Sequence, residues 1–158
     1  MIYKNKKGIY SVEFAIVAGV FFILLFAVLE CGRLMYTWNV LTEVSRRGAR
    51  LATVCHVSGT SSFSPASNRV LDAATFADTG LLPNLDSANI NITYLDLNGA
   101  AATTFPDIRL VRAEIVNYQH QLLIPFFSIT LNSPSFSTTL PAESLGVTRT
   151  TYTTCNEI

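Results

Sequence analysis

The sequence lacks an excess of charge of either sign. It contains 11 Lys and Arg residues and 11 Asp and Glu residues, so its formal net charge is zero. Proteins that bind nucleic acid usually carry a clustered positive excess. We therefore expect no nucleic-acid partner.

Residue patterns typical of catalytic and metal sites are also missing. The two histidines, His56 and His120, do not have the spacing of metal ligands. Ser58, Ser61 and Ser62 are not in the strand–turn–helix context of a nucleophilic serine. No glycine-rich phosphate loop and no pair of external acids suited to acid–base catalysis occurs. We expect no enzyme activity, no cofactor and no metal.

No proline precedes Pro65, so nothing in the first third of the chain breaks a helix. An uninterrupted apolar run covers residues 14–29, and residues 9–12 extend it to nearly the thickness of a bilayer core, about 30 Å. It is too long for a secretory signal, and no small-residue cleavage site follows it. We predict a transmembrane helix at residues 9–29. Three preceding lysines place the N-terminus in the cytoplasm and residues 30–158 outside.

Helical spacing continues beyond the apolar run. Seven residues fall on one face of the continued helix: Leu34, Trp38, Leu41, Val44, Gly48, Ala52 and Cys55. We predict one helix from about Ile9 to about Val54, roughly 70 Å long. Its first half would lie in lipid and its second half would pack on a sheet.

The start of the apolar run carries an unexpected acid. A charge at the centre of a spanning helix costs roughly 2.5–3.5 kcal/mol, so Glu13 calls for a functional explanation. Its carboxylate could also reach the cytoplasmic headgroups, since it lies about one turn from Ile9. What distinguishes this junction is an ordered set of residues: Lys4, Lys6, Lys7, Gly8, Glu13 and Phe14.

This set resembles the processing site of type IV pilin-like proteins, in which a prepilin peptidase cuts after the glycine. The resemblance implies a leader at residues 1–8, with Ile9 as the first mature residue and Glu13 as the fifth. In pilins the fifth-position glutamate pairs with the new N-terminal amine of a neighbouring subunit. The Glu13-Phe14 pair resembles the Flp/Tad (type IVb) branch.

The next segment is similar to TadE-like minor pseudopilins, which show E-x-G-R-x-x-Y followed by an A/S-R-x-G-A-R-x-A helix. The matching residues are Glu30, Gly32, Arg33, Tyr36, Ser45, Arg46, Gly48, Ala49, Arg50 and Ala52. The resemblance covers about the first third of the chain. It implies a minor pilin or pseudopilin that takes part in assembling a Tad/Flp-type pilus from the bacterial inner membrane.

The same resemblance implies four partners: the prepilin peptidase, the major pilin, a second minor pseudopilin and an inner-membrane assembly platform driven by a cytoplasmic ATPase. Whether the protein lies in the pilus or at its base is left open. The alternative function is an uncleaved, signal-anchored external domain that binds a ligand or an envelope partner.

Arg46, Arg47 and Arg50 form a basic cluster on the polar side of the helix. They are either an ordinary solvated face, with Glu43 available as an ion-pair partner, or a contact with another subunit or anionic lipid.

Cys55 and Cys155 lie at opposite ends of the external domain, a location where disulfides persist. We predict that they are bonded; the alternative is two unpaired buried thiols. Cys31, at the membrane boundary, is interpreted as a small apolar residue.

The external domain is predicted to be α+β, a small antiparallel sheet packed on the long helix as in pilins. One short helix would start at Ser64-Pro65 and end near Gly80. Strands are expected at residues 90–94, 108–123 and 145–154, with the odd-numbered residues from Val111 to Asn117 facing the core. Asn98-Gly99 marks a turn.

The most apolar external segment is residues 122–129. We expect a short helix or a lipid-proximal loop from Phe126 to Leu131, after an interruption at Pro125. This segment either belongs to the core or forms a patch that touches the membrane or a partner.

Overall fold

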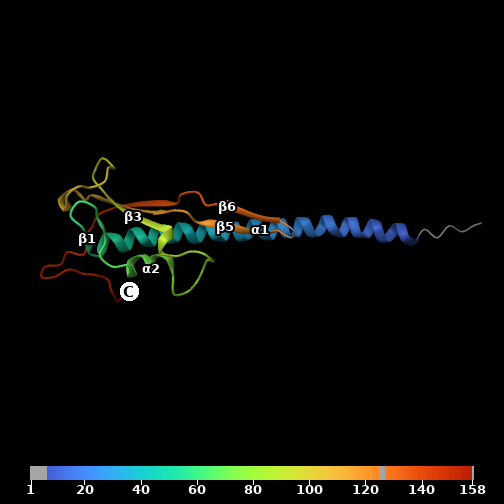
Figure 1. The fold of residues 1–158 in the computed structure, drawn as a ribbon, viewed down its shortest axis with the longest axis horizontal. Coiled ribbons are helices and arrows are strands. Elements are labelled where there is room, and N and C mark those ends of the chain that lie inside the picture. The colour runs from blue at the N-terminus through green and yellow to red at the C-terminus, as the bar shows by residue number, and fades with distance from the viewer. Residues whose placement is uncertain (1–6, 125–126, 158) are drawn as a thin grey trace, which may run out of the picture.

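One long helix forms the axis of the molecule. The computed structural model describes residues 7–124 and 127–157. Helix α1 (Lys7–Val54) has 48 residues, which gives it a length of about 72 Å. Much of its N-terminal half projects alone, and the other elements lie along the rest of the helix (Figure 1). Within the described residues, α1 is the helix long and apolar enough to cross a membrane, and its most apolar part is not buried in the fold.

The main sheet packs on the C-terminal half of α1. It is antiparallel, with the order β3-β4-β7, and consists of β3 (Ile90–Leu95), β4 (Leu110–Ile115) and β7 (Ser137–Pro141). Ala113 in the central strand pairs with Ile92 on one side and Thr138 on the other. Val111, Ala113 and Ile115 are buried, as the predicted alternation requires. The α+β prediction is confirmed.

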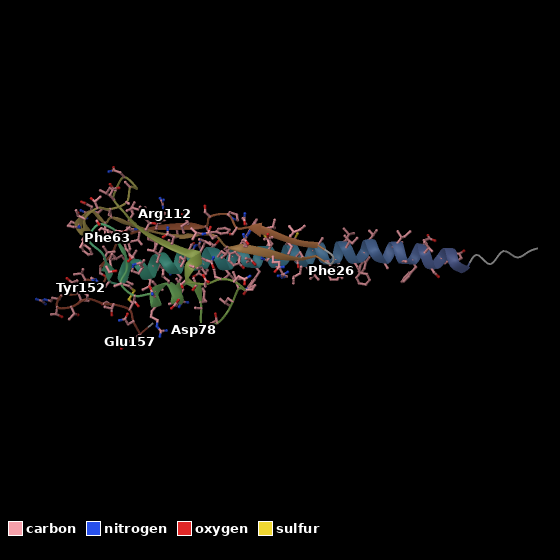
Figure 2. The ribbon with its side chains drawn as sticks, in the orientation of Figure 1. Phe26, Phe63, Asp78, Arg112, Tyr152 and Glu157 are labelled. Atoms are coloured by element: carbon pink, nitrogen blue, oxygen red, sulfur yellow. A yellow bond between two sulfur atoms is a disulfide. The ribbon has the colours of Figure 1, made fainter. Side chains whose placement is uncertain are left out.

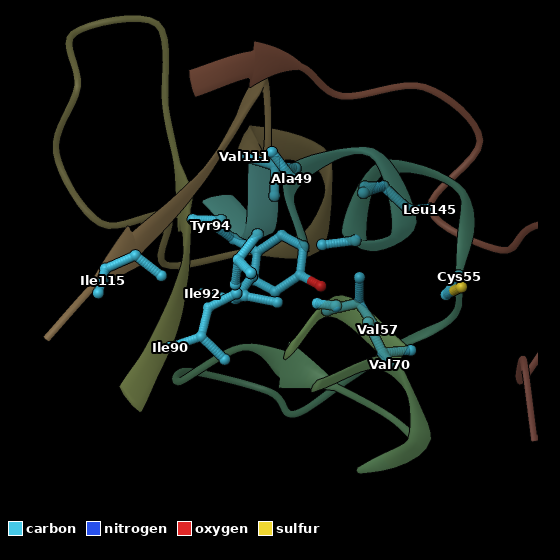
Figure 3. Packing of buried hydrophobic residues seen from close by; sticks show 14 of the residues in the cluster. Ala49, Cys55, Val57, Val70, Ile90, Ile92, Tyr94, Val111, Ile115 and Leu145 are labelled. Carbon is cyan, nitrogen blue, oxygen red and sulfur yellow. The ribbon is translucent and has the colours of Figure 1, made fainter. Parts of the chain in front are cut away.

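The hydrophobic core lies between the inner face of the sheet and the docked half of α1. Figure 3 shows Tyr94 and Ile92 from β3 converging with Val111 from β4 and Ala49 from α1. Gly48 allows the helix to approach closely, because an added Cβ would lie 2.5 Å from the Ile90 Cδ1 atom. The predicted docking face of the helix therefore corresponds to the face that packs.

A short helix, α2 (Arg69–Thr75), packs on α1 and adds Val70 and Ala74 to the core, which confirms the extra helix. Its predicted start at Ser64 is wrong. Ser64 and Pro65 form strand β2 (Ser64–Pro65), paired with β1 (Val57–Ser58), and the Ala66 N–H donates to the His56 carbonyl at 2.8 Å. This pairing requires extended backbone, so it overrides the local helix-start signal. The helix also ends before Gly80, because Phe76 adopts a left-handed conformation with φ 55°.

The predicted strand at 108–123 is two strands. Asn117 has φ 55°, so the chain turns between β4 and β5 (Gln119–Ile124). Asn117 is exposed and Tyr118 is buried, which reverses the burial expected at these two positions. The left-handed residue shifts the phase of the alternation by one.

β5 pairs with β6 (Phe127–Asn132) in a separate two-stranded sheet. The expectation of a short helix or loop at 126–131 is therefore wrong for residues 127–131, because this segment continues a β-ladder with β5. Pro125 and Phe126 lie outside the described residues. Two single-turn 3₁₀ helices, η1 (Ser87–Asn89) and η2 (Phe105–Asp107), precede β3 and β4.

The predicted strand at 145–154 is also wrong. Leu145 has φ 48° and Gly146 has φ 75°, so the chain turns where a strand was expected to begin. The segment folds on itself through one bridge between Val147 and Tyr152. The third strand of the main sheet is β7, which the sequence analysis missed.

Candidate functional site

The candidate site is the length of α1, from the predicted processing position to the docked half. The bond between Gly8 and Ile9 lies in the first turn of the helix. The first N–H groups of a helix have no acceptor within it, so this turn opens more easily than those that follow. Lys4 and Lys6 lie outside the described residues.

Glu13 and Phe14 are both exposed on the projecting half of α1, with 75% of Phe14 accessible. The 16 residues that follow Glu13, positions 14–29, include no charged residue. Among the described residues, the one ion pair is between Arg33 and Glu30. The described part of the fold thus supplies no cation for the Glu13 carboxylate.

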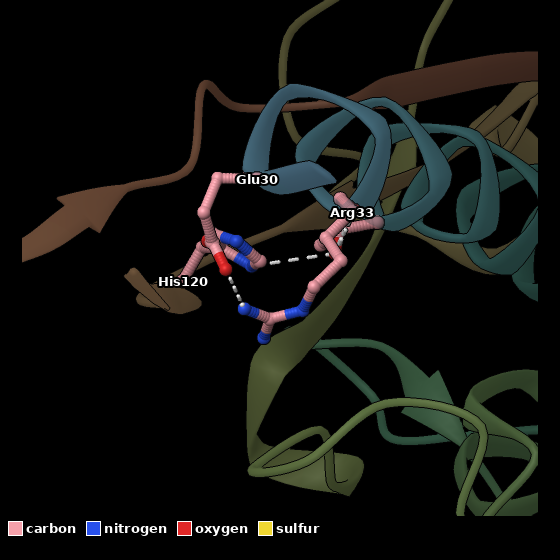
Figure 4. A network of polar contacts seen from close by, with 4 residues as sticks. Glu30, Arg33 and His120 are labelled. Atoms are coloured by element: carbon pink, nitrogen blue, oxygen red, sulfur yellow. Dashed lines mark hydrogen bonds and ion pairs between the residues drawn. The ribbon is translucent and has the colours of Figure 1, made fainter. Parts of the chain in front are cut away.

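A polar cluster marks the end of the apolar run. Glu30 Oε1 accepts a hydrogen bond from Arg33 Nη1 at 2.6 Å (Figure 4). One turn later, the Thr37 hydroxyl donates to the Arg33 carbonyl at 3.0 Å, and Thr37 Oγ1 lies 3.3 Å from His120 Nδ1 on β5. When the hydroxyl proton is engaged by the carbonyl, the His120 tautomer with a proton on Nδ1 donates to Thr37 Oγ1; the direction of this hydrogen bond depends on the tautomer.

This cluster is more buried than the sequence suggested. Thr37 and His120 are 3% and 6% exposed. Among the described residues, Glu30 Oε2 and His120 Nε2 are buried polar atoms without a hydrogen-bond partner. The sequence analysis placed His120 only in a strand and did not consider Thr37. The available signal was the position of Thr37, one turn beyond Arg33 and between Leu34 and Leu41 on the docking face.

On the docked half of α1, the small and the charged residues of the TadE-like pattern lie on different faces. Its small residues are buried: Ser45, Gly48, Ala49 and Ala52. Ser45 also bonds across the interface, with its Oγ 2.9 Å from Thr138 Oγ1 on β7. Arg46 and Arg50 are exposed. Small residues thus admit the sheet and α2, while the arginines face outward.

The basic cluster is not a uniform solvated face. The guanidinium of Arg47 lies 4.4 Å from the centre of the Phe76 ring, a cation–π geometry that ties α1 to the end of α2. Glu43 forms no ion pair with Arg46 or Arg47 in the described part of the chain. Arg46 and Arg50, four residues apart, present their charges together on one side of the helix.

The C-terminal tail is tied to the end of α1. A disulfide joins Cys55 to Cys155, with their Cα atoms 5.7 Å apart. Beside it, the His56 N–H donates to the Thr153 carbonyl at 2.8 Å and the Leu145 N–H donates to the Thr53 carbonyl at 2.9 Å. Cys31 is a free, exposed cysteine at the other end of the docked region.

Burial raises the pKa of the Tyr94 phenol, which lies in the core among apolar side chains. Burial also raises the pKa of Tyr118, and the nearby positive charge of Arg33 opposes this effect. Among the described residues, no three His, Cys, Asp or Glu side chains come together as a metal site would require.

One comparison with known proteins gave a match, and this match lies on α1. The family model described as TadE-like protein matches residues 8–50. Searches of curated proteins and of solved structures gave no match. The TadE-like family consists of structural pilus components rather than enzymes. The resemblance predicted from the sequence is confirmed: residues 8–50 of this chain carry the TadE-like segment.

Proposed function

We propose that the protein is a minor pilin or pseudopilin that takes part in assembling a Tad/Flp-type pilus. The observation that carries this proposal is the division of α1. Its TadE-like segment begins in an exposed apolar half and continues, without a break, into a half that packs on the external domain. A single rigid helix of this kind connects a membrane to a domain outside it.

Processing would release residues 1–8 and expose Ile9 as a new N-terminus. The amine would then be the cation that pairs with Glu13 of a neighbouring subunit, since a buried carboxylate becomes tolerable when a cation partners it. The position of the Gly8–Ile9 bond in the first helical turn supports this step, because that turn has the fewest internal hydrogen bonds.

Residues 9–29 would span the bacterial inner membrane, with the N-terminus in the cytoplasm and residues 30–158 outside. The disulfide between Cys55 and Cys155 supports the external location, because such bonds persist in oxidising compartments. Arg46 and Arg50 would contact an acidic surface of another subunit. The partners would be the prepilin peptidase, the major pilin, a second minor pseudopilin and the inner-membrane assembly platform.

The deciding experiment is the intact mass of the protein purified from membranes, with and without a co-expressed prepilin peptidase. We expect a peptidase-dependent loss of residues 1–8, abolished in a Gly8→Ala variant. An unchanged mass with an active peptidase would instead indicate an uncleaved, signal-anchored binding domain.

A second experiment tests the assembly step. We expect Glu13→Gln to be processed normally but to fail in pilus assembly, because the neutral amide cannot pair with the amine of Ile9. Glu43→Gln is the matched control, since Glu43 is an exposed glutamate on the same helix. Equal assembly by the two variants would remove Glu13 from the mechanism.

A further inference from the structure

The β5–β6 hairpin stands apart from the main sheet. It forms its own two-stranded sheet and contacts α1 through β5. Figure 1 shows it extending beside α1 toward the projecting, apolar half of the helix. A two-stranded hairpin is at best marginally stable alone in water, so its surroundings matter to its stability.

Polarity changes along the hairpin. Near its base, the outward face carries polar pairs, Gln119 opposite Asn132 and Gln121 opposite Thr130. Toward the tip, the same face carries Leu123, which is 63% exposed.

The inner face of the hairpin carries apolar residues that stay exposed on β6. There Ile129 pairs with Leu122 and Leu131 pairs with His120, and both β6 residues are exposed, at 43% and 38%. No Asp, Glu, Lys or Arg occurs between Glu114 and Glu143. The exposed apolar residues of the hairpin therefore have no cover in the described fold, and the hairpin's own strands carry no charge.

Leu123 lies at the level where the apolar run of α1 ends. His120 Nδ1 is 3.3 Å from Thr37 Oγ1, which fixes the level of the base. Three strand residues advance about 10 Å, and six to seven helical residues cover the same distance. Leu123 is thus level with about Glu30, and Figure 2 shows the hairpin ending near Phe26.

We propose that the apolar end of the β5–β6 hairpin inserts into the outer leaflet of the bilayer that α1 spans. This inference rests on the proposed membrane anchoring of α1. The occupant is lipid because the exposed Leu123 and Ile129 lie beside the end of the exposed apolar surface that includes Phe26 and Leu29, and the hairpin itself carries no charged residue. Leu123 then lies at the membrane boundary beside Glu30, and the polar base of the hairpin, level with Thr37, lies on the water side of that boundary.

The hairpin gives the external domain a second attachment to the membrane. The Thr37–His120 hydrogen bond fixes β5 against α1, so the hairpin and the helix hold the domain in one orientation to the bilayer. Movement of the subunit out of the membrane requires the hairpin to leave the lipid together with the helix.

Site-directed spin labelling of the full chain tests this proposal. The protein is reconstituted in phosphatidylethanolamine–phosphatidylglycerol vesicles with the disulfide intact and with a Cys31→Ser background. Single cysteines, Leu123→Cys, Leu97→Cys and Phe22→Cys, carry a nitroxide. Leu97, 77% exposed in the turn between β3 and β4, is the matched exposed leucine. Accessibility to oxygen, which concentrates in lipid, is compared with accessibility to a water-soluble nickel chelate.

We expect the Leu123 and Phe22 labels to be relaxed mainly by oxygen and the Leu97 label mainly by nickel. Preferential relaxation of the Leu123 label by nickel overturns the proposal, as does protection from both reagents, which would mean that protein covers the tip. If Phe22 reports lipid in those cases, the anchoring of α1 stands. A Phe22 label relaxed by nickel overturns the anchoring and the hairpin proposal together.

Discussion

Loss of the Cys55–Cys155 disulfide should destabilise the external domain by an amount that follows from its position in the chain. The bonded residues are 100 positions apart. In the chain-entropy model, opening a loop of about 100 residues costs up to about 4.7 kcal/mol, and removal of native disulfides from small domains typically costs about 2–5 kcal/mol. Cys155→Ser is the cleaner variant, because Cys55 is 1% exposed and serine there would bury a hydroxyl.

The assay is urea unfolding of the full chain in detergent, followed by the fluorescence of Trp38. This is the single tryptophan of the chain, and its ring lies 6.4 Å from that of Phe136, so it reports the separation of α1 from the external domain. With a denaturant slope of about 2 kcal/mol per M, a loss of 2–4.7 kcal/mol lowers the midpoint by roughly 1–2.4 M.

Cys31→Ser is the control, because Cys31 is exposed and outside the bond. Its midpoint should equal that of the wild type. If Cys155→Ser has the same midpoint as this control, the bond does not constrain the unfolded chain and the reasoning is refuted.

Three further predictions concern single sites of the external domain. Gly146→Ala should lower the free energy of unfolding by more than about 1–3 kcal/mol, because Gly146 has φ +75° and an added Cβ would collide with the backbone of His56. A smaller loss in the same urea assay would contradict this close approach. Thr37→Val should leave the buried His120 Nδ1 without its hydrogen-bond partner, at a cost of about 1–3 kcal/mol, and should speed amide hydrogen exchange in β5; unchanged exchange would remove this bond as the anchor of the hairpin. Burial raises the pKa of Tyr94, so the folded state keeps a proton that the unfolded chain loses at about pH 10, and the stability should fall as the pH rises above that value. In urea midpoints measured from pH 8 to 11, Tyr94→Phe should flatten this decline. An equal decline in both proteins would show that Tyr94 does not cause it.

The long helix and the central strands could be predicted because their signals are local and repeated. No proline occurs in the first 64 residues, and apolar side chains recur at the helical period up to the end of α1. The alternation through Val111, Ala113 and Ile115 likewise reflects one buried face. In both cases many residues agree, so one misleading position does not change the prediction.

The remaining elements depend on contacts that the local sequence does not contain. Asn117 is one left-handed residue, yet it ends β4 and reverses the burial that follows. Ser64 has a good helix-start signal, but pairing with Ser58 requires extended backbone. The Thr-rich C-terminal segment has high strand propensity, but it turns at Gly146 and is bonded at Cys155, so it joins no sheet. Tertiary context overrides propensity in each case.

The TadE-like segment ends inside the part of α1 that packs on the sheet. The match ends at residue 50, within the docked half of α1, whereas the sheet lies entirely beyond it. The helix face that receives the sheet combines small residues, Gly48, Ala49 and Ala52, with the fully buried Leu41 and Val44. At Gly48 the sheet approaches so closely that an added Cβ would lie 2.5 Å from the Ile90 Cδ1 atom. The outward charges of Arg46 and Arg50 and the small residues Gly48 and Ala49 thus belong to the matched segment, whereas the sheet that packs on them comes from the sequence after the match.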